Sequence, residues 1–225
     1  MDHFSDPAAV ERYITATPQR VPGYADLHRM ALVLLSEKVP DNACVLVLGA
    51  GGGLELLAFA EARPNWSFVG VDPSQPMLDL AADVLGPRRS QVELMKGVVT
   101  DAPSWPFEGA TCLLTLHFLS VPERLHVLRE LKSRLKPGAP LIIAHHCKSD
   151  AGAAEDWLAR SVAFSIDTAS DTHTVVASAA NMAKQLTLLT VTEEEALLIE
   201  AGFRDPALFY AGFSFRGWVA WANKD

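Results

Sequence analysis

The sequence predicts an α/β domain built on a mostly parallel sheet of seven strands, with helices on both faces. Short apolar runs alternate with amphipathic helical segments, and a glycine-rich turn at residues 49–53 joins the first such run to the next helix. The chain then ends in two strand-like segments, 208–213 and 218–222, that are close enough to form an antiparallel hairpin. Alternating strands and helices imply βαβ units. We therefore expect about five parallel strands followed by the hairpin, in a Rossmann-like arrangement.

Composition excludes several classes of protein. The 225 residues are 49% hydrophobic, enough for one sizeable core. Nineteen Lys and Arg against 27 Asp and Glu give a net charge of −8, which argues against a dedicated nucleic-acid surface. No apolar stretch approaches the length of a membrane span, and the acidic, polar start is unlike a signal peptide. We expect a cytoplasmic protein that does not bind to membranes.

The cysteines predict neither disulfides nor a metal site. Cys44, Cys112 and Cys147 are odd in number and far apart, with no Cys-x-x-Cys pair. The run His145-His146-Cys147 offers metal-binding side chains, but adjacent ligands cannot easily share one tetrahedral ion. No metal is therefore expected.

The elements can be placed in order along the chain. Residues 1–40 are expected to form an N-terminal helical cap segment, in which residues 27–35 carry apolar side chains at helical spacing. The parallel strands are expected at 44–48, 67–71, 92–95, 111–116 and 141–144. The helices between them are expected at 54–62, from Ser74 to residue 85, and from the capping box Ser120-x-x-Glu123 to residue 136.

Residues 150–190 interrupt this alternation and are expected to form a helical cover. Two helical stretches are centred on 157–166 and 175–186. A second capping box, Thr192-x-x-Glu195, is expected to open a short helix, with Glu193, Glu194 and Glu195 solvated at its start.

The glycine turn is the first candidate binding element. Glycines between a buried strand and a helix let a ligand approach the backbone beside the positive end of the helix dipole. The dinucleotide fingerprint needs glycine or alanine where Leu54 stands, whereas the spacing Gly-x-Gly-x-Gly is the one used for S-adenosylmethionine (SAM). A tight turn that binds no ligand is the alternative interpretation.

Two carboxylates follow the next strands. Asp72 ends the second strand, where it could accept hydrogen bonds from ribose hydroxyls, or could simply cap the following helix. Asp101 follows the third strand and could accept from an adenine amino group, or be an ordinary loop residue. Their order along the chain favours a nucleoside site.

Three segments together resemble class I SAM-dependent methyltransferases. They are residues 45–53 (VLVLGAGGG), 69–72 (VGVD) and 135–143 (LKPGAPLII), and with Ala201-Gly202-Phe203 and the hairpin the similarity covers about residues 41–223. The resemblance implies that residues 41–225 form a SAM-binding domain with a substrate cover at about 150–190. One departure is Val47, where the family often has an acidic residue that supports the methionine end of SAM.

A narrower resemblance links the chain to the carboxy-S-adenosylmethionine synthases of wobble-uridine tRNA modification, which use SAM and prephenate. It rests on residues 21–24 (VPGY), 119–124 and 208–222. It implies a homodimer, with Tyr24 closing over the cofactor. An arginine that holds the extra carboxylate in that family aligns with Ala179 here, which argues for a different substrate. The two resemblances together imply these cofactor contacts: Tyr24, Gly49, Ala50, Gly51, Gly53, Asp72, Pro73, Met77, Asp101, Ala102 and Thr115.

His117 is the candidate catalytic residue, because it follows the fourth strand at the edge where parallel sheets bind ligands. Methyl transfer needs alignment of the reactants more than a base, so His117 could equally be a loop histidine bonded to backbone. Side-chain alternation sends His145 and His146 to opposite faces. Trp157, Phe164, Ile166 and Met182 could line an acceptor pocket or pack in the core.

The prediction is a SAM-dependent methyltransferase that acts on a small-molecule acceptor. One alternative is a carboxy-SAM synthase-like enzyme that uses SAM and prephenate. Another is a SAM-binding domain without catalytic activity. A nicotinamide oxidoreductase is disfavoured by Leu54.

Overall fold

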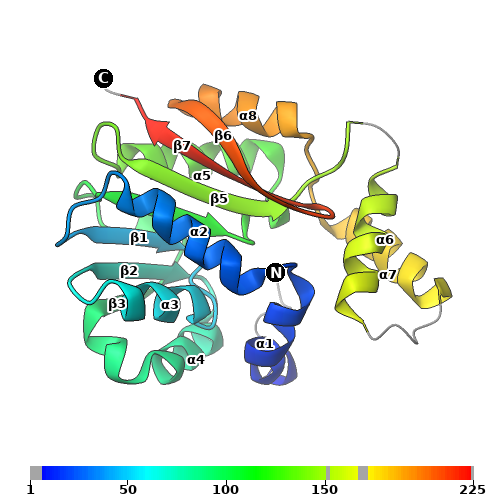
Figure 1. The fold of residues 1–225 in the computed structure, drawn as a ribbon, viewed down its shortest axis with the longest axis horizontal. Helices are drawn as coiled ribbons and strands as arrows, with labels where there is room; N and C mark the ends of the chain where they lie inside the picture. The colour runs from blue at the N-terminus through cyan, green and yellow to red at the C-terminus, as the bar shows by residue number, and fades with distance from the viewer. Residues whose placement is uncertain (1–6, 151–152, 167–171, 224–225) are drawn as a thin grey trace.

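A single seven-stranded sheet forms the centre of the computed structural model, which describes residues 7–150, 153–166 and 172–223 (Figure 1). The strand order is β3-β2-β1-β4-β5-β7-β6. β7 pairs antiparallel with both β5 and β6, and the other pairs are parallel, which confirms the predicted sheet and hairpin. The strands are β1 (Cys44–Leu48), β2 (Ser67–Asp72), β3 (Val92–Lys96), β4 (Gly109–Leu113), β5 (Pro140–His146), β6 (Phe203–Gly212) and β7 (Phe215–Ala222).

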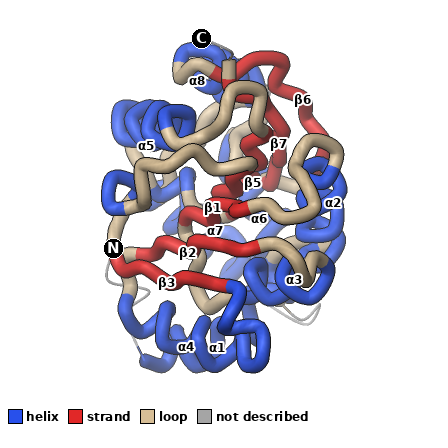
Figure 2. The backbone as a smooth tube through the Cα atoms, turned by 90° about the vertical axis from the view of Figure 1, so that its left-hand side faces the viewer, coloured by secondary structure: helices blue, strands red, loops and turns tan. Residues whose placement is uncertain are grey.

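Helices cover both faces of the sheet (Figure 2). Neighbouring residues of β1 enter different cores: Val45 and Val47 pack with Leu27 of α2 (Tyr24–Ser36) and Phe59 of α3 (Leu54–Ala62). Leu46 and Leu48 pack on the opposite face, in a core that also contains residues of α5 (Val121–Ser133) and α8 (Val191–Glu200). Burial on both faces explains why the β1 segment is apolar throughout. α4 (Gln75–Leu85) packs against α3, β2 and β3.

Three further helices complete the fold: α6 and α7 lie at the right-hand end of the view in Figure 1, and α1 lies at the bottom near the middle. α1 (Pro7–Arg20) packs against α2, α4 and α6 (Ala154–Ser165), and α6 packs against α7 (Thr172–Gln185). α6 and α7 correspond to the two helical stretches predicted for the cover. Short 3₁₀ turns lie at Gly86–Gln91, Val99–Asp101 and Leu116–Phe118. Among the described residues, no helix is long and apolar enough to cross a membrane.

The fourth strand ends earlier than its apolar run predicted. β4 stops at Leu113 instead of residue 116, and Leu114 has a positive φ of 58°. Residues 116–118 then form a 3₁₀ turn, so His117 lies on this turn, several residues beyond the strand. The apolar run continued past the strand because Leu116 is itself buried in the core.

The start of α8 also differs from the prediction. The capping box is Thr190 with Glu193 instead of Thr192 with Glu195: the Thr190 N–H donates to Glu193 Oε2 at 2.8 Å. α8 therefore begins at Val191, and Glu194 falls on its buried side. The expectation that residues 193–195 are all solvated is wrong for Glu194, whose side chain is fully buried.

Candidate functional site

The glycine loop requires its glycines for backbone shape and for close packing. Gly49, Gly51 and Gly53 all have positive φ, between 50° and 82°. A Cβ on Gly49 would lie 2.1 Å from Thr115 Oγ1, and one on Gly53 would lie 2.9 Å from the Cα of Ala81. Gly53 thus brings α4 against α3, which is a packing role within the protein.

Asp72 holds this loop from the end of β2. Its carboxylate accepts the N–H of Gly51 at 2.9 Å and the N–H of Ser74 at 2.9 Å. Burial raises the pKa of Asp72, and these two hydrogen bonds partly offset the rise. Ser74, whose Oγ accepts the N–H of Met77 at 3.4 Å, is the side chain that caps α4. Asp72 therefore joins the glycine loop to the next helix.

Tyr13 covers the glycine loop, a contact that no pattern in the sequence predicted. A Cβ on Gly51 would lie 2.8 Å from Tyr13 Oη, and one on Gly52 would lie 2.6 Å from Tyr13 Cδ1. Burial raises the pKa of Tyr13 to about 12, and the nearby Tyr24 hydroxyl and Gly52 N–H partly offset the rise. No spacing motif marks Tyr13, because its contacts are with residues distant in the sequence.

The loop after β3 lies beside Asp72. The Gly97 N–H donates to the Asp72 carbonyl at 3.0 Å, which ties the two strand ends together. Asp101 is exposed, and its carboxylate accepts the Val98 N–H at 2.8 Å. Ala102 is buried, and its carbonyl accepts from Arg134 Nε at 3.3 Å. The predicted nucleoside-binding carboxylates thus lie at the ends of neighbouring strands.

The remaining predicted contacts surround the loop. Pro73 is exposed at the start of the turn into α4, and Met77 is buried with its Cε 3.6 Å from the Cβ position of Gly51. Thr115 packs on Gly49, and its hydroxyl donates to the Leu113 carbonyl at 3.0 Å. The left-handed backbone of Leu114 turns the chain between Leu113 and Thr115. Such strain at the end of a strand is often found at functional sites.

His117 belongs to a chain of buried polar groups under α6. Its Nδ1 accepts the His146 N–H at 3.3 Å. His146 Nδ1 lies 2.7 Å from Ser214 Oγ, which in turn lies 2.6 Å from Ser161 Oγ on α6. Burial lowers the pKa of His146 to about 3 and holds the pKa of His117 well below its usual range.

The hydrogen bonding of His117 sets its chemistry. Its imidazole is neutral near pH 7, and since Nδ1 accepts a hydrogen bond, its proton is on Nε2. Nε2–H can donate to an acceptor oxygen, but it cannot take up a proton. The prediction of an acceptor-side contact is therefore compatible with the geometry as a hydrogen-bond donor, and a general base needs the other tautomer.

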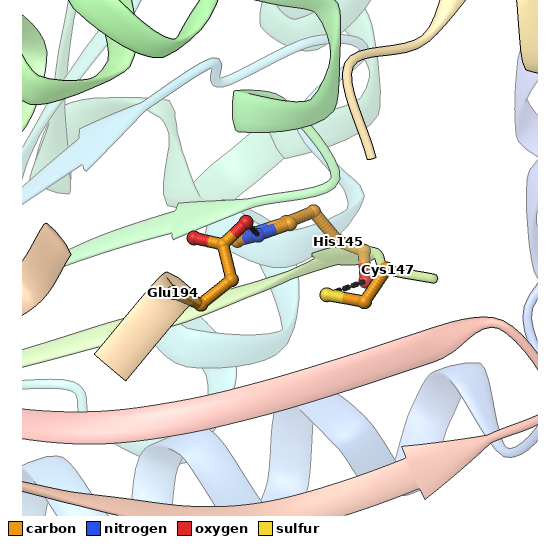
Figure 3. A group of neighbouring side chains, drawn as sticks. All are labelled: His145, Cys147 and Glu194. Atoms are coloured by element: carbon orange, nitrogen blue, oxygen red, sulfur yellow. Dashed lines mark hydrogen bonds and ion pairs between the residues drawn. The ribbon is translucent and has the colours of Figure 1, made fainter. Parts of the chain in front are cut away.

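A second buried cluster lies on the opposite face of β5 (Figure 3). His145 Nε2 lies 2.9 Å from Glu194 Oε1, and Cys147 Sγ is 3.9 Å from the His145 carbonyl. The ligand-type atoms of these three residues lie within 4.8 Å of one another. Arg124 forms an ion pair with Glu194 and donates to the Thr187 carbonyl at 2.7 Å. The counter-charge of Glu194 is thus a guanidinium of this chain, and the cluster joins α5, β5 and α8.

The residues proposed for an acceptor pocket lie in the helical cover. Trp157 is half-buried and is faced by Arg160 at 4.4 Å and Arg216 at 5.9 Å from its ring centroid. Phe164 is 48% exposed and lies 5.7 Å from Phe213, ring centroid to centroid. Ile166 and Met182 are half-buried, and Ala179 is buried on α7. The partial exposure of these apolar side chains is more than core packing requires.

The sequence is similar to a known methyltransferase domain. Residues 45–138 match a family model described as a methyltransferase domain. The carboxy-S-adenosyl-L-methionine synthase of Desulfotalea psychrophila is 25% identical over 169 residues, which are 65% of this chain and 69% of that protein. The synthase of Campylobacter fetus subsp. fetus is 27% identical over 62% of this chain, but the chain covers only 59% of that protein.

Solved structures share the whole architecture. A putative O-methyltransferase from Nostoc punctiforme superimposes with a TM-score of 0.69 at 20% identity, over 94% of this chain and 59% of that chain. At this identity the likeness concerns the fold. The matched family model spans the segment from β1 to the turn after α5.

Proposed function

We propose that this chain, which its matched domain and its fold make a class I SAM-dependent methyltransferase, transfers a methyl group to a small-molecule acceptor held under α6 and α7. SAM supplies an electrophilic methyl group on a sulfonium. The protein has to hold the nucleoside, to shield the sulfonium from water and to align the acceptor with the methyl group.

The relationship between Asp72 and the glycine loop carries this proposal. Asp72 is 8% exposed and uses one oxygen for Gly51 and the other for Ser74. A carboxylate offers about four lone-pair sites, so two remain for the ribose hydroxyls of the cofactor. Burial makes such charge-assisted hydrogen bonds stronger than they would be in water.

The donors and surfaces at the site fit the cofactor. Gly49, Ala50 and Gly51 give a backbone surface next to Asp72, with Met77 beneath it. Asp101 and Ala102 are proposed to contact the adenine ring, since Gly97 ties their loop to Asp72. Pro73 and Thr115 flank the site, and Tyr24 lies behind Tyr13.

The acceptor is proposed to be small because of what surrounds the site. α1 and α6 pack against each other, and the apolar side chains of α6 and α7 are only partly exposed. The net charge of −8 offers little attraction for nucleic acid. In this proposal His117 donates a hydrogen bond from Nε2 to an acceptor oxygen and so orients it.

Calorimetric titration with SAM tests the cofactor site. Replacing Asp72 with Ala is expected to weaken binding at least tenfold, or about 1.4 kcal/mol. Asp79→Ala, on the exposed side of α4, is the matched control and should bind SAM like the wild type. An unchanged dissociation constant for Asp72→Ala would contradict the site.

Release of S-adenosylhomocysteine in an acceptor screen then tests methyl transfer. SAM binding without any release would favour a domain that only binds SAM.

Carboxy-SAM synthesis is the second candidate, favoured by the names of the relatives. Ala179 is buried on α7 and brings no cation to the position where the resemblance expects an arginine. Incubation with SAM and prephenate separates the two candidates, since synthesis gives a product one carboxyl group heavier than SAM.

The resemblance also leads us to propose a homodimer, and the cysteine pattern leads us to propose a reducing, cytoplasmic environment. Cys44, Cys112 and Cys147 are free thiols, as such an environment would maintain. Sedimentation velocity at several protein concentrations tests the dimer.

A further inference from the structure

Glu55, in the first turn of α3, is a buried carboxylate without a sufficient partner. It is 7% exposed, and its Oε1 has no hydrogen-bond partner in the part of the chain that the structure describes. The same holds for the hydroxyl of its neighbour Thr111 on β4. A buried, unpaired polar group costs free energy, so a site that retains one usually has a ligand or a proton to satisfy it.

Among the residues that the structure describes, no Lys or Arg forms an ion pair with Glu55. Burial raises its pKa to about 7, and the Thr111 hydroxyl is the one group that lowers it. The other fully buried glutamate, Glu194, shows the usual solution, because Arg124 and His145 both contact it. The contrast indicates that the positive charge for Glu55 comes from outside the chain.

Glu55 lies where the first strand lacks an acid. Val47 pairs with Thr111 in the register of β1 and β4, and Glu55 reaches Thr111 from α3. Class I methyltransferases often carry an acidic residue at the position of Val47. In this chain the carboxylate next to Thr111 comes from α3, at Glu55, and not from the first strand.

The surroundings of Glu55 connect it to the glycine loop. Glu55 is two residues beyond Gly53, the last glycine of the loop and the N-cap of α3, and its charge raises the pKa values of Tyr13 and Tyr24. The side chain of Tyr13 covers the backbone of Gly51 and Gly52, where the N–H groups of the loop could bind a carboxylate once Tyr13 moves away. Donors for a carboxylate and an acceptor for an ammonium group therefore lie side by side, which is the recognition pattern of an α-amino acid.

We propose that Glu55 binds the ammonium group of the amino-acid part of the cofactor, in place of an acidic residue on β1. This inference rests on the proposed function, because it assigns a residue to the same cofactor. In it, Tyr13 leaves the loop, the cofactor carboxylate takes its place over Gly51 and Gly52, and the ammonium group pairs with Glu55.

Two probes that differ in the amino-acid part test the assignment. S-adenosylhomocysteine carries the ammonium group, and 5′-methylthioadenosine keeps the nucleoside but lacks the amino acid. Glu55→Gln is expected to weaken binding of S-adenosylhomocysteine at least tenfold and to leave binding of 5′-methylthioadenosine within about twofold, since it removes only the charge. Glu61→Gln, on the exposed side of the same helix, is the control and should change neither.

The outcomes separate this inference from the proposed function. If the wild type binds neither probe, the cofactor site itself is wrong. If it binds both and Glu55→Gln lowers neither affinity, or both equally, the assignment of Glu55 is overturned while the cofactor site stands. Adding Val47→Asp to Glu55→Gln should restore most of the preference for S-adenosylhomocysteine. Retained binding of 5′-methylthioadenosine shows that each variant is folded.

Discussion

The ring of Tyr13 lies directly on Gly52, so closely that a Cβ at Gly52 would be 2.6 Å from its Cδ1. The hydroxyl of the same side chain lies over Gly51, 2.8 Å from the position of a Cβ there. A helix from the N-terminal part of the chain thus covers the loop on which the proposed cofactor site depends. Any ligand that uses this loop has to exchange places with Tyr13.

Replacing Tyr13 with Ala should therefore accelerate SAM binding. Removal of the ring leaves the loop uncovered, and we expect the association rate to rise severalfold in stopped-flow measurements. Tyr13→Phe keeps the ring and loses the oxygen, so its association rate should stay close to that of the wild type. Slower association of Tyr13→Ala would instead place Tyr13 among the residues that hold the cofactor.

Gly53→Ala is expected to destabilise the fold by about 1–3 kcal/mol, because the new Cβ would lie 2.9 Å from the Cα of Ala81 and φ is 82°. Urea denaturation measures the loss. Gly23 has the same left-handed backbone, with φ 64° and ψ 36°, but the nearest atom to its Cβ position is 3.8 Å away, so Gly23→Ala shows the backbone strain alone. Equal losses in the two variants would mean that contact with α4 does not matter.

Stability should fall as the medium becomes acidic. Burial lowers the pKa of His28 to about 4 and that of His146 to about 3, from 6.5. As the pH falls through 6.5 the unfolded chain binds protons that the folded chain does not, which costs about 1.4 kcal/mol per pH unit for each histidine. The free energy of unfolding should therefore be lower at pH 5 than at pH 7.

Glu55 has the opposite effect on the pH dependence of stability, because its pKa is raised on folding. Replacing Glu55 is therefore the control for the prediction about the histidines. Its pKa is about 7 in the folded chain against 4.5, so its stabilising effect is complete below pH 4.5 and is lost as the pH rises through 7. Glu55→Gln should raise the stability at pH 7 by up to about 3 kcal/mol and so widen the difference between pH 7 and pH 5. A narrower difference would show that Glu55 is ionised and paired in the free protein.

Glu194→Gln should be strongly destabilising. It leaves the buried Arg124 without a counter-charge, at a cost of about 3–5 kcal/mol in chemical denaturation. The adjacent Glu193→Gln, at an exposed position, should cost less than about 1 kcal/mol. A double replacement of Arg124 and Glu194 by Met and Leu should recover most of the loss, because it removes both charges together.

Elements set by local patterns were predictable. α3 was predicted with its observed bounds, because a glycine turn precedes it and a proline follows it closely. The end of β4 was missed because Leu114 and Leu116 continue the apolar run although the backbone has already turned. The position of Asp72 at the end of β2, beside the glycine loop, was predictable because strand ends converge at one edge of a parallel sheet.

Contacts between residues that are far apart in the sequence could not be predicted from local patterns. Glu194 stands in a run of three glutamates that is typical of a solvated helix start, and its partner Arg124 is 70 residues away. Tyr13 and Glu55 likewise meet only when α1 is folded against the sheet. Their roles depend on which side chains share one buried volume, and periodicity does not specify that.

The hydrogen bonds of the loop have a thermodynamic consequence. Four of the five N–H groups of residues 49–53 have acceptors within the protein: the Val71 carbonyl for Gly49 and Ala50, the Asp72 carboxylate for Gly51 and the Ala50 carbonyl for Gly53. The loop is thus preorganised before any ligand arrives, and binding carries little entropic penalty for ordering its backbone. The affinity of the site is then set by a competition between one intramolecular side chain and the incoming ligand, so the length and stability of α1 tune it without any change to the loop itself.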